Sequence, residues 1–122
     1  MNPTLAPQAY KESAVLTAPP ERLVVMLYDG IRRFLFQATV AMREGNVELT
    51  NNRLQRAEAI IDELNNTLDM SAGEVADRLR ALYVFSKRHL MQARLKRSPE
   101  MIEEVSRLLD TVGDAWRQIA GN

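Results

Sequence analysis

The feature that most constrains the fold is the spacing of apolar residues between four chain breakers. These breakers are Pro19-Pro20, EGN at 44–46, MSAGE at 70–74 and KRSPE at 96–100. Between them, apolar residues recur every three or four positions, which is the period of one face of an α-helix. No stretch of the sequence shows a competing strand pattern. The sequence therefore predicts an all-α protein with four long helices.

Each of the four segments carries one apolar stripe that we assign to the core. The first two stripes are Leu23, Leu27, Ile31, Phe34, Ala38 and Ala41, and Val47, Leu54, Ala57, Ile61, Leu64 and Leu68. The other two are Val75, Leu79, Leu82, Ser86, His89 and Ala93, and Ile102, Val105, Leu109, Val112, Trp116 and Ile119. Helices of about 30 Å joined by short connections must run antiparallel to their neighbours. We predict an antiparallel up-down-up-down four-helix bundle over residues 19–122, with Trp116 largely buried.

The helix starts carry capping signals. Asn46 can cap the second helix, and Ser98-Pro99-Glu100 places a capping side chain, a proline and an acidic residue at the start of the fourth. These residue types satisfy or complement the free N–H groups of a first helical turn.

The dipeptide Asp29-Gly30 would mark a tight turn in many chains. Here the apolar stripe continues through it, from Leu27 to Ile31, so the segment is predicted to be helical. A glycine inside a helix costs about 1 kcal/mol relative to alanine. We interpret Gly30 as a place where another helix or a bound segment approaches closely, and a tolerated glycine without a role is the alternative.

Composition excludes several classes of partner. Lysine plus arginine and aspartate plus glutamate both number 16, so the chain lacks the basic excess that drives binding to nucleic acid or anionic membranes. The sequence has no cysteine and no apolar run long enough for a membrane span or a signal peptide. We expect a cytosolic protein with no nucleic-acid partner and no membrane insertion.

Residues 1–18 stand apart from the helical segments. They contain Pro3 and Pro7, and their apolar residues are too few and too irregular to secure an independent helix: Leu5, Tyr10, Val15 and Leu16. We interpret this segment as a flexible N-terminal leader that is apolar enough to lie in a groove, either as a lid that competes with a client or as an arm that contacts it.

Some apolar residues point away from the predicted core stripes. On the first helix these are Val25, Phe36 and Val40, with Met26 nearer the flank, and on the third they are Val84 and Met91. A continuous exposed patch would mark a surface for a partner, whereas scattered apolar residues are ordinary. Methionine suits a surface that adapts to another chain. Both readings stay open from the sequence.

No pattern in the chain predicts catalysis, a cofactor or a metal site. The sequence has one histidine, no glycine-rich phosphate loop and no Glu-x-x-His pair. Histidine phosphotransfer domains are four-helix bundles with one functional histidine, so His89 provides an alternative function. Their motif has lysine and glycine where HLMQA has Gln92 and Ala93. We instead expect His89 to face the core side and to be hydrogen-bonded.

A family resemblance covers nearly the whole chain. The stretches VLTAPPERLVVMLYDGIRRFLFQA, RAEAIIDELNNTLD and ALYVFSKRHLMQA, with a closing helix that ends in AWRQI, resemble the bacterial flagellin export chaperones of the FliS type. Thr17-Ala18-Pro19-Pro20 and Leu27-Tyr28-Asp29-Gly30 match the most specific block, and Leu82-Tyr83 matches a second Leu-Tyr. The chain departs from the family at Ala72-Gly73, often Gly-Gly, and at Arg94, often Asn.

The resemblance implies a chaperone that is not an enzyme. It would hold the disordered C-terminal segment of flagellin in the cytosol, prevent premature polymerisation and help deliver flagellin to the flagellar type III export apparatus. Whether it forms a homodimer, or shares its surface with a co-chaperone, is open. A helical homo-oligomeric adaptor is another alternative. From the outward residues and the resemblance together, the predicted partner-binding residues are Tyr10, Val25, Tyr28, Gly30, Phe36, Tyr83, Val84 and Met91.

Overall fold

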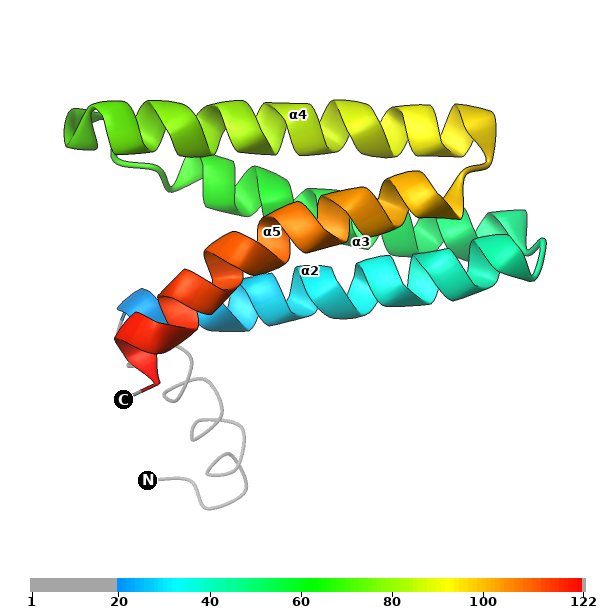
Figure 1. Cartoon of the computed structure of the whole chain (residues 1–122), viewed down its shortest axis with the longest axis horizontal. Coiled ribbons are helices and arrows are strands. Elements are labelled where there is room, and N and C mark those ends of the chain that lie inside the picture. The colour runs from blue at the N-terminus through cyan, green and yellow to red at the C-terminus, as the bar shows by residue number, and fades with distance from the viewer. Residues whose placement is uncertain (1–19, 122) are drawn as a thin grey trace, which may run out of the picture.

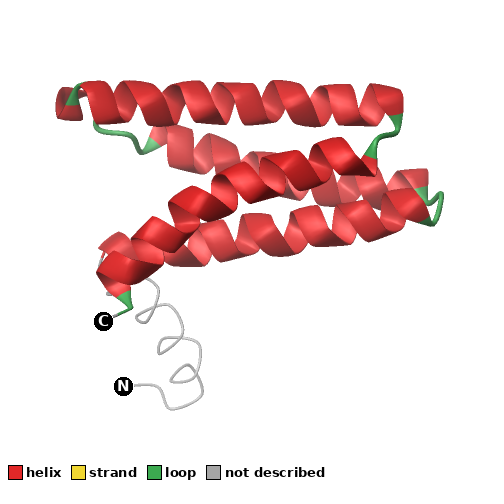
Figure 2. Cartoon of the chain, in the orientation of Figure 1, coloured by secondary structure: helices red, strands yellow, loops and turns green. Residues whose placement is uncertain are grey.

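The computed structural model describes residues 20–121, which form a bundle of four long helices (Figure 1). These are α2 (Pro20–Arg43), α3 (Val47–Asn66), α4 (Glu74–Lys96) and α5 (Pro99–Ala120), with a short 3-10 helix, η2 (Met70–Ala72), before α4. Successive long helices run in opposite directions, and Figure 2 shows no strand in the described part of the chain. The predicted all-α, up-down-up-down bundle is confirmed.

Helix α2 is the centre of the packing, because it makes extensive contacts with both α3 and α5. Helix α4 touches α3 and α5 less extensively. Figure 1 shows the reason for part of this difference: α5 crosses the bundle obliquely, from the C-terminal end of α4 to the N-terminal end of α2. The two ends of α5 therefore have different neighbours.

All four long helices contribute to one hydrophobic core. Its largest fully buried apolar side chains are Ile31, Leu35, Leu54, Ile61, Leu90, Ile102, Val105 and Leu109. Buried alanines on the same faces let the helices approach closely: Ala38, Ala57 and Ala93. Removing such apolar surface from water is the main force that stabilises the bundle.

The predicted caps form hydrogen bonds at both helix starts. The Asn46 side chain accepts a hydrogen bond from the Leu49 N–H at 3.0 Å, and Ser98 Oγ accepts one from the Met101 N–H at 3.3 Å. Pro99 occupies the first turn of α5, where a missing N–H costs nothing. The breakers at 19–20, 44–46 and 96–100 therefore mark helix boundaries, whereas α3 ends at Asn66, before the breaker at 70–74 and before Leu68 of its predicted stripe.

Gly30 lies inside α2 and is buried against α3. A Cβ atom placed on Gly30 would lie 3.0 Å from Ile60 Cδ1, so the Ile60 side chain would have to shift slightly to make room for it. The interpretation that another helix approaches at Gly30 is confirmed, and that helix is α3.

Three residues assigned to the core stripes are instead more than half exposed. They are Val47, Val75 and Ile119. Each lies in the first or last turn of its helix. Trp116 is only partly buried, although it packs against the core. Helical periodicity identifies a face, but it does not show how far along the helix that face is covered.

Candidate functional site

The outward apolar residues lie on two separate surfaces. Phe36 and Val40 are exposed on α2, and Val84 and Met91 are exposed on α4. Figure 1 places α2 and α4 along different sides of the bundle. Val25, on the same side of α2 as Phe36, is only partly exposed. The set predicted from the sequence therefore does not form one continuous patch.

The first surface is a groove between α2 and α5, which we call the α2/α5 groove. It encloses about 560 Å³. Leu35 reaches its floor from the core, while Phe36, which is 69% exposed, and Val40 stand on the α2 wall. The rest of the lining is polar or charged: Asp29, Arg32, Arg33, Thr39, Arg43, Glu103, Ser106, Arg107 and Asp110.

Two ion pairs join the walls of the α2/α5 groove. Arg43 on α2 donates from both terminal nitrogens to the carboxylate of Glu103 on α5, at 3.0 and 3.4 Å. This bond raises the pKa of Arg43 and lowers the pKa of Glu103. Arg32 Nε lies 3.5 Å from Asp110 Oδ2. Because both pairs are exposed, they set the positions of the charged groups more than they stabilise the fold.

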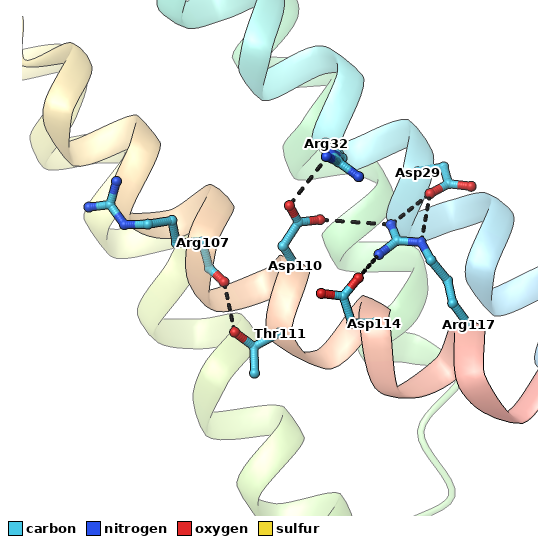
Figure 3. A network of polar contacts seen from close by, with 7 residues as sticks. All are labelled: Asp29, Arg32, Arg107, Asp110, Thr111, Asp114 and Arg117. Carbon is cyan, nitrogen blue, oxygen red and sulfur yellow. Dashed lines mark hydrogen bonds and ion pairs between the residues drawn. The ribbon is translucent and has the colours of Figure 1, made fainter.

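A cluster of charged residues continues the groove toward the C-terminal end of α5 (Figure 3). Arg117 donates to Asp29 Oδ1 from Nη2 at 2.7 Å and from Nε at 3.2 Å. Its Nη1 donates to Asp114 at 2.5 Å, and its Nη2 lies 3.7 Å from Asp110. These carboxylates, Asp29 first, raise the pKa of Arg117. The cluster fixes the last turns of α5 against the N-terminal half of α2.

Tyr28 and Tyr83, both predicted to bind a partner, are buried. Their hydroxyl oxygens lie 2.6 Å apart and link α2 to α4 across the core. Burial raises the pKa of both hydroxyls. On the other side of Tyr28, a Cβ atom on Gly113 of α5 would lie 3.3 Å from Tyr28 Cβ. Tyr28, Tyr83 and the buried Gly30 thus position helices in this structure, and direct partner contact by them stays a prediction.

The second surface is a row of apolar residues along α4, which we call the α4 row: Val84, Met91 and Leu95. They are 40%, 57% and 74% exposed. Their spacing of seven and then four residues puts them on one line along the helix. Leu95 was missed in the sequence, although its i+4 distance from Met91 is a usable signal.

His89 lies at the boundary between α4 and α5. Its Nε2 is 2.6 Å from Glu104 Oε2, and its ring stacks on Phe85 with centroids 5.1 Å apart. The contact with Glu104 confirms the predicted hydrogen bond. The Glu104 carboxylate therefore engages one of the two ring nitrogens. The side chain is 19% exposed, so it is less buried than predicted.

Three further expectations concern the N-terminal leader, a metal site and a membrane span. Tyr10 and the leader of residues 1–18 fall outside the described residues. Within residues 20–121, no three His, Asp or Glu side chains gather as a metal ion would require. In the same range, no helix combines the length and hydropathy needed to cross a bilayer.

Comparisons with known proteins point to one family. The family model described as flagellar protein FliS matches residues 3–122. The chain is 39% identical over 115 residues to the flagellar secretion chaperone FliS of Salmonella typhimurium, covering 93% of this chain and 85% of the relative. It is 37% identical over 123 residues to FliS of Campylobacter jejuni, covering 100% and 96%. FliS of Bacillus subtilis is 36% identical over 110 residues, covering 90% and 82%. This chain therefore belongs to the FliS family of flagellar secretion chaperones.

Proposed function

We propose that this protein is a cytosolic export chaperone for flagellin. It binds the disordered C-terminal segment of flagellin, prevents premature polymerisation and helps deliver flagellin to the flagellar type III export apparatus. The observation that carries this proposal is the α2/α5 groove, which exposes Phe36 and Val40 in a chain of the FliS family. A segment with an apolar stripe can cover these side chains.

The geometry of the α2/α5 groove suits a helix. Phe36 and Val40 are four residues apart, so they lie one turn apart on the same side of α2. An amphipathic client helix meets such a wall with anchors spaced i, i+3 or i+4 and i+7. The client helix would gain its structure on binding, because an isolated short helix is marginal in water.

The α4 row offers a second contact for the same client. A single rigid helix cannot touch α2 and α4 together, because they lie along different sides of the bundle. A disordered segment can contact both by passing around the bundle. The entropy lost on ordering that segment moderates the affinity, which keeps the complex reversible at the export apparatus.

Calorimetric titration with a flagellin C-terminal peptide tests the proposal. Binding should show a negative heat-capacity change, since apolar surface is buried, and a gain of helical circular dichroism. Phe36→Ser should weaken binding about tenfold while the unfolding midpoint stays nearly unchanged, because most of this side chain is in water. Thr111→Ala, an exposed change on α5 away from the α2 wall, is the matched control. Absence of binding at tens of micromolar, a threshold of roughly −6 kcal/mol, contradicts the proposal.

A homo-oligomeric adaptor is the alternative that the exposed α4 row supports. Light scattering with and without the flagellin peptide separates the two functions. An adaptor would self-associate through Met91 and Leu95 without peptide, whereas a chaperone would engage peptide without first self-associating. The same sample, treated with a phosphodonor response regulator, should give no acid-labile phosphate on His89.

A further inference from the structure

The solvent face of α4 carries a repeat that is longer than the α4 row. Five exposed residues follow one another at spacings of three, four, three and four: Ala81, Val84, Arg88, Met91 and Leu95. This is the a/d pattern with which one helix packs lengthwise along another. The buried side chains of α4 lie on its opposite face, toward α3 and α5. We call the five residues the α4 seam, which is about 21 Å long and is covered by no helix among residues 20–121.

Arg88 is the one charged member of the α4 seam. The residues three and four positions away on α4 are uncharged, so no carboxylate of this helix lies within one turn: Val84, Phe85, Met91 and Gln92. The Arg88 guanidinium makes no hydrogen bond or ion pair with any residue from 20 to 121. An unpaired positive charge therefore lies in the middle of an apolar seam.

The carboxylates that reach α4 from its two neighbours beside Arg88 already have partners. Asp62 of α3 accepts a hydrogen bond from Lys87 Nζ at 2.6 Å. Glu104 of α5 lies 2.6 Å from His89 Nε2. Both neighbouring carboxylates are thus engaged by other side chains of the described chain, which leaves Arg88 to solvent or to a partner.

The charge of Arg88 argues against a second copy of this chain as the occupant of the α4 seam. In a parallel pair, equivalent residues face each other, so Arg88 would meet Arg88. In an antiparallel pair, the registers that cover Met91 or Leu95 with an apolar residue of the seam leave Arg88 opposite an uncharged residue. One register pairs Arg88 with Asp77. That register places Met91 opposite Glu74, so it leaves the apolar part of the seam uncovered.

From this pattern we propose that the α4 seam binds one helix of the flagellin client, with an apolar 3-4 repeat and a carboxylate opposite Arg88. The apolar residues of that helix remove Val84, Met91 and Leu95 from water. Its carboxylate pairs with the guanidinium, which an apolar residue would cover without a partner and a lysine would repel. The inference rests on the proposed function for the source of the helix, but not for its chemistry. It adds a charge by which the α4 seam distinguishes amphipathic helices.

Two synthetic peptides test the chemistry of the α4 seam. Both have about 21 residues, or three heptads, with apolar a and d positions except one central position, which is glutamate in the first peptide and lysine in the second. Each carries a fluorophore and is titrated with the protein at trace peptide concentration, so that the peptides themselves do not associate. The glutamate peptide should bind about fivefold to tenfold more tightly at low salt, with a smaller ratio at high salt. No change in anisotropy for either peptide up to about 1 mM protein overturns the inference.

Charge reversal on the protein gives the complementary test. Arg88→Glu should reverse the preference, so that the lysine peptide binds more tightly than the glutamate peptide. Arg22→Glu makes the same charge change on an exposed arginine of α2 and should leave the preference unchanged. An unchanged preference in Arg88→Glu, or equal changes in the two variants, would show that the α4 seam does not distinguish this charge and would overturn the inference.

The apolar part of the α4 seam is tested separately. Met91→Ser should weaken binding of both peptides by about threefold to tenfold, because it removes an apolar contact without changing charge. Val75→Ser, an exposed change on α4 outside the 3-4 repeat, is the matched control. Both side chains are more than half exposed, so the unfolding midpoints should stay near that of the wild type. Equal effects of the two variants on binding would place the peptides elsewhere and overturn the inference.

The long flagellin C-terminal peptide tests the source of the helix. Calorimetry should show that Arg88→Glu weakens its binding by about threefold to tenfold, whereas Arg22→Glu leaves it unchanged. Flagellin peptide that binds wild-type and Arg88→Glu protein equally would overturn the inference while leaving the proposed function intact. Absence of flagellin binding to the wild type would contradict the proposed function, and with it the source of the helix, while the two synthetic peptides still decide the chemistry of the α4 seam.

Discussion

At the scale of single residues, the hydroxyl pair of Tyr28 and Tyr83 is the most informative contact in the core. Each hydroxyl is buried, and each has the other as its hydrogen-bond partner at 2.6 Å. Removing one hydroxyl leaves the other without that partner, which costs about 1–3 kcal/mol of unfolding free energy. Removing both should cost less than the sum. Chemical denaturation of Tyr28→Phe, Tyr83→Phe and the double variant measures this coupling, and additive losses would show that the bond contributes little.

The same pair predicts how stability changes at alkaline pH. Burial raises the pKa of both tyrosines above the ordinary value of 10.0, so the folded state retains these protons where the unfolded chain releases them. The unfolding free energy should therefore be constant with respect to this pair below pH 10 and fall as pH rises above 10. Denaturation midpoints between pH 8 and 11 should show this fall in the wild type and a smaller one in the double phenylalanine variant. An identical fall in both would assign it to other groups.

Some residues could be placed from the sequence and others could not. Gly30 was predicted correctly because an uninterrupted stripe around it excluded a turn. Tyr83 was assigned to partner binding through family resemblance, which does not reveal that the side chain meets Tyr28 inside the bundle. Arg107 was not identified at all, because a charged residue on a helix gives no periodic signal. Its place in the groove depends on how α5 crosses α2.

At the scale of helices, the sequence predicted each long element well because breakers and caps define its ends. What it could not predict is which outward faces meet. The sequence left open whether the outward residues of α2 and α4 form a continuous patch, and in the structure they lie on two separate surfaces. Pairing of α2 with α5 forms the groove beside Phe36, whereas the row on α4 has no helix beside it in the described chain. The apolar periodicity of one helix does not show which other helix packs beside its outward face.

The α4 row provides an element-scale prediction. If the flagellin segment passes around the bundle, Leu95→Ser should weaken its binding by about threefold to tenfold, since a well-covered apolar side chain contributes about 1 kcal/mol or more. Folding stability should change little, because Leu95 is 74% exposed. Calorimetry with the long flagellin peptide measures the effect. Val75→Ser changes another exposed apolar residue, at the other end of α4, and is the control.

The length of the peptide separates a wrapped client from a local one. A short peptide that fills only the α2/α5 groove should bind wild-type and Leu95→Ser protein equally, whereas the long peptide should distinguish them. If neither peptide distinguishes them, the α4 row does not contact the client. Its exposed residues would then be ordinary surface, or a site for self-association.

At the scale of the whole molecule, the N-terminal leader and the groove are connected through the start of α2. Residues 1–18 precede Pro20, the first residue of α2, and this end of α2 lies beside the last turns of α5 (Figure 1). The Arg117 cluster, which joins α5 to Asp29 of α2, is formed there. The leader contains Leu5, Tyr10 and Leu16, so it carries apolar side chains close in sequence to the groove.

We expect the leader to act as a lid that competes with the client. Tyrosine suits this role, because its ring can fill an apolar site while its hydroxyl stays in water, so displacement strands no polar group. Deleting residues 1–16 should tighten flagellin peptide binding, by about threefold to tenfold if the lid covers the groove most of the time. Tyr10→Ala should produce part of that gain. Calorimetry on the three proteins decides the matter: weaker binding after deletion would make the leader a contacting arm, and unchanged binding would remove it from recognition.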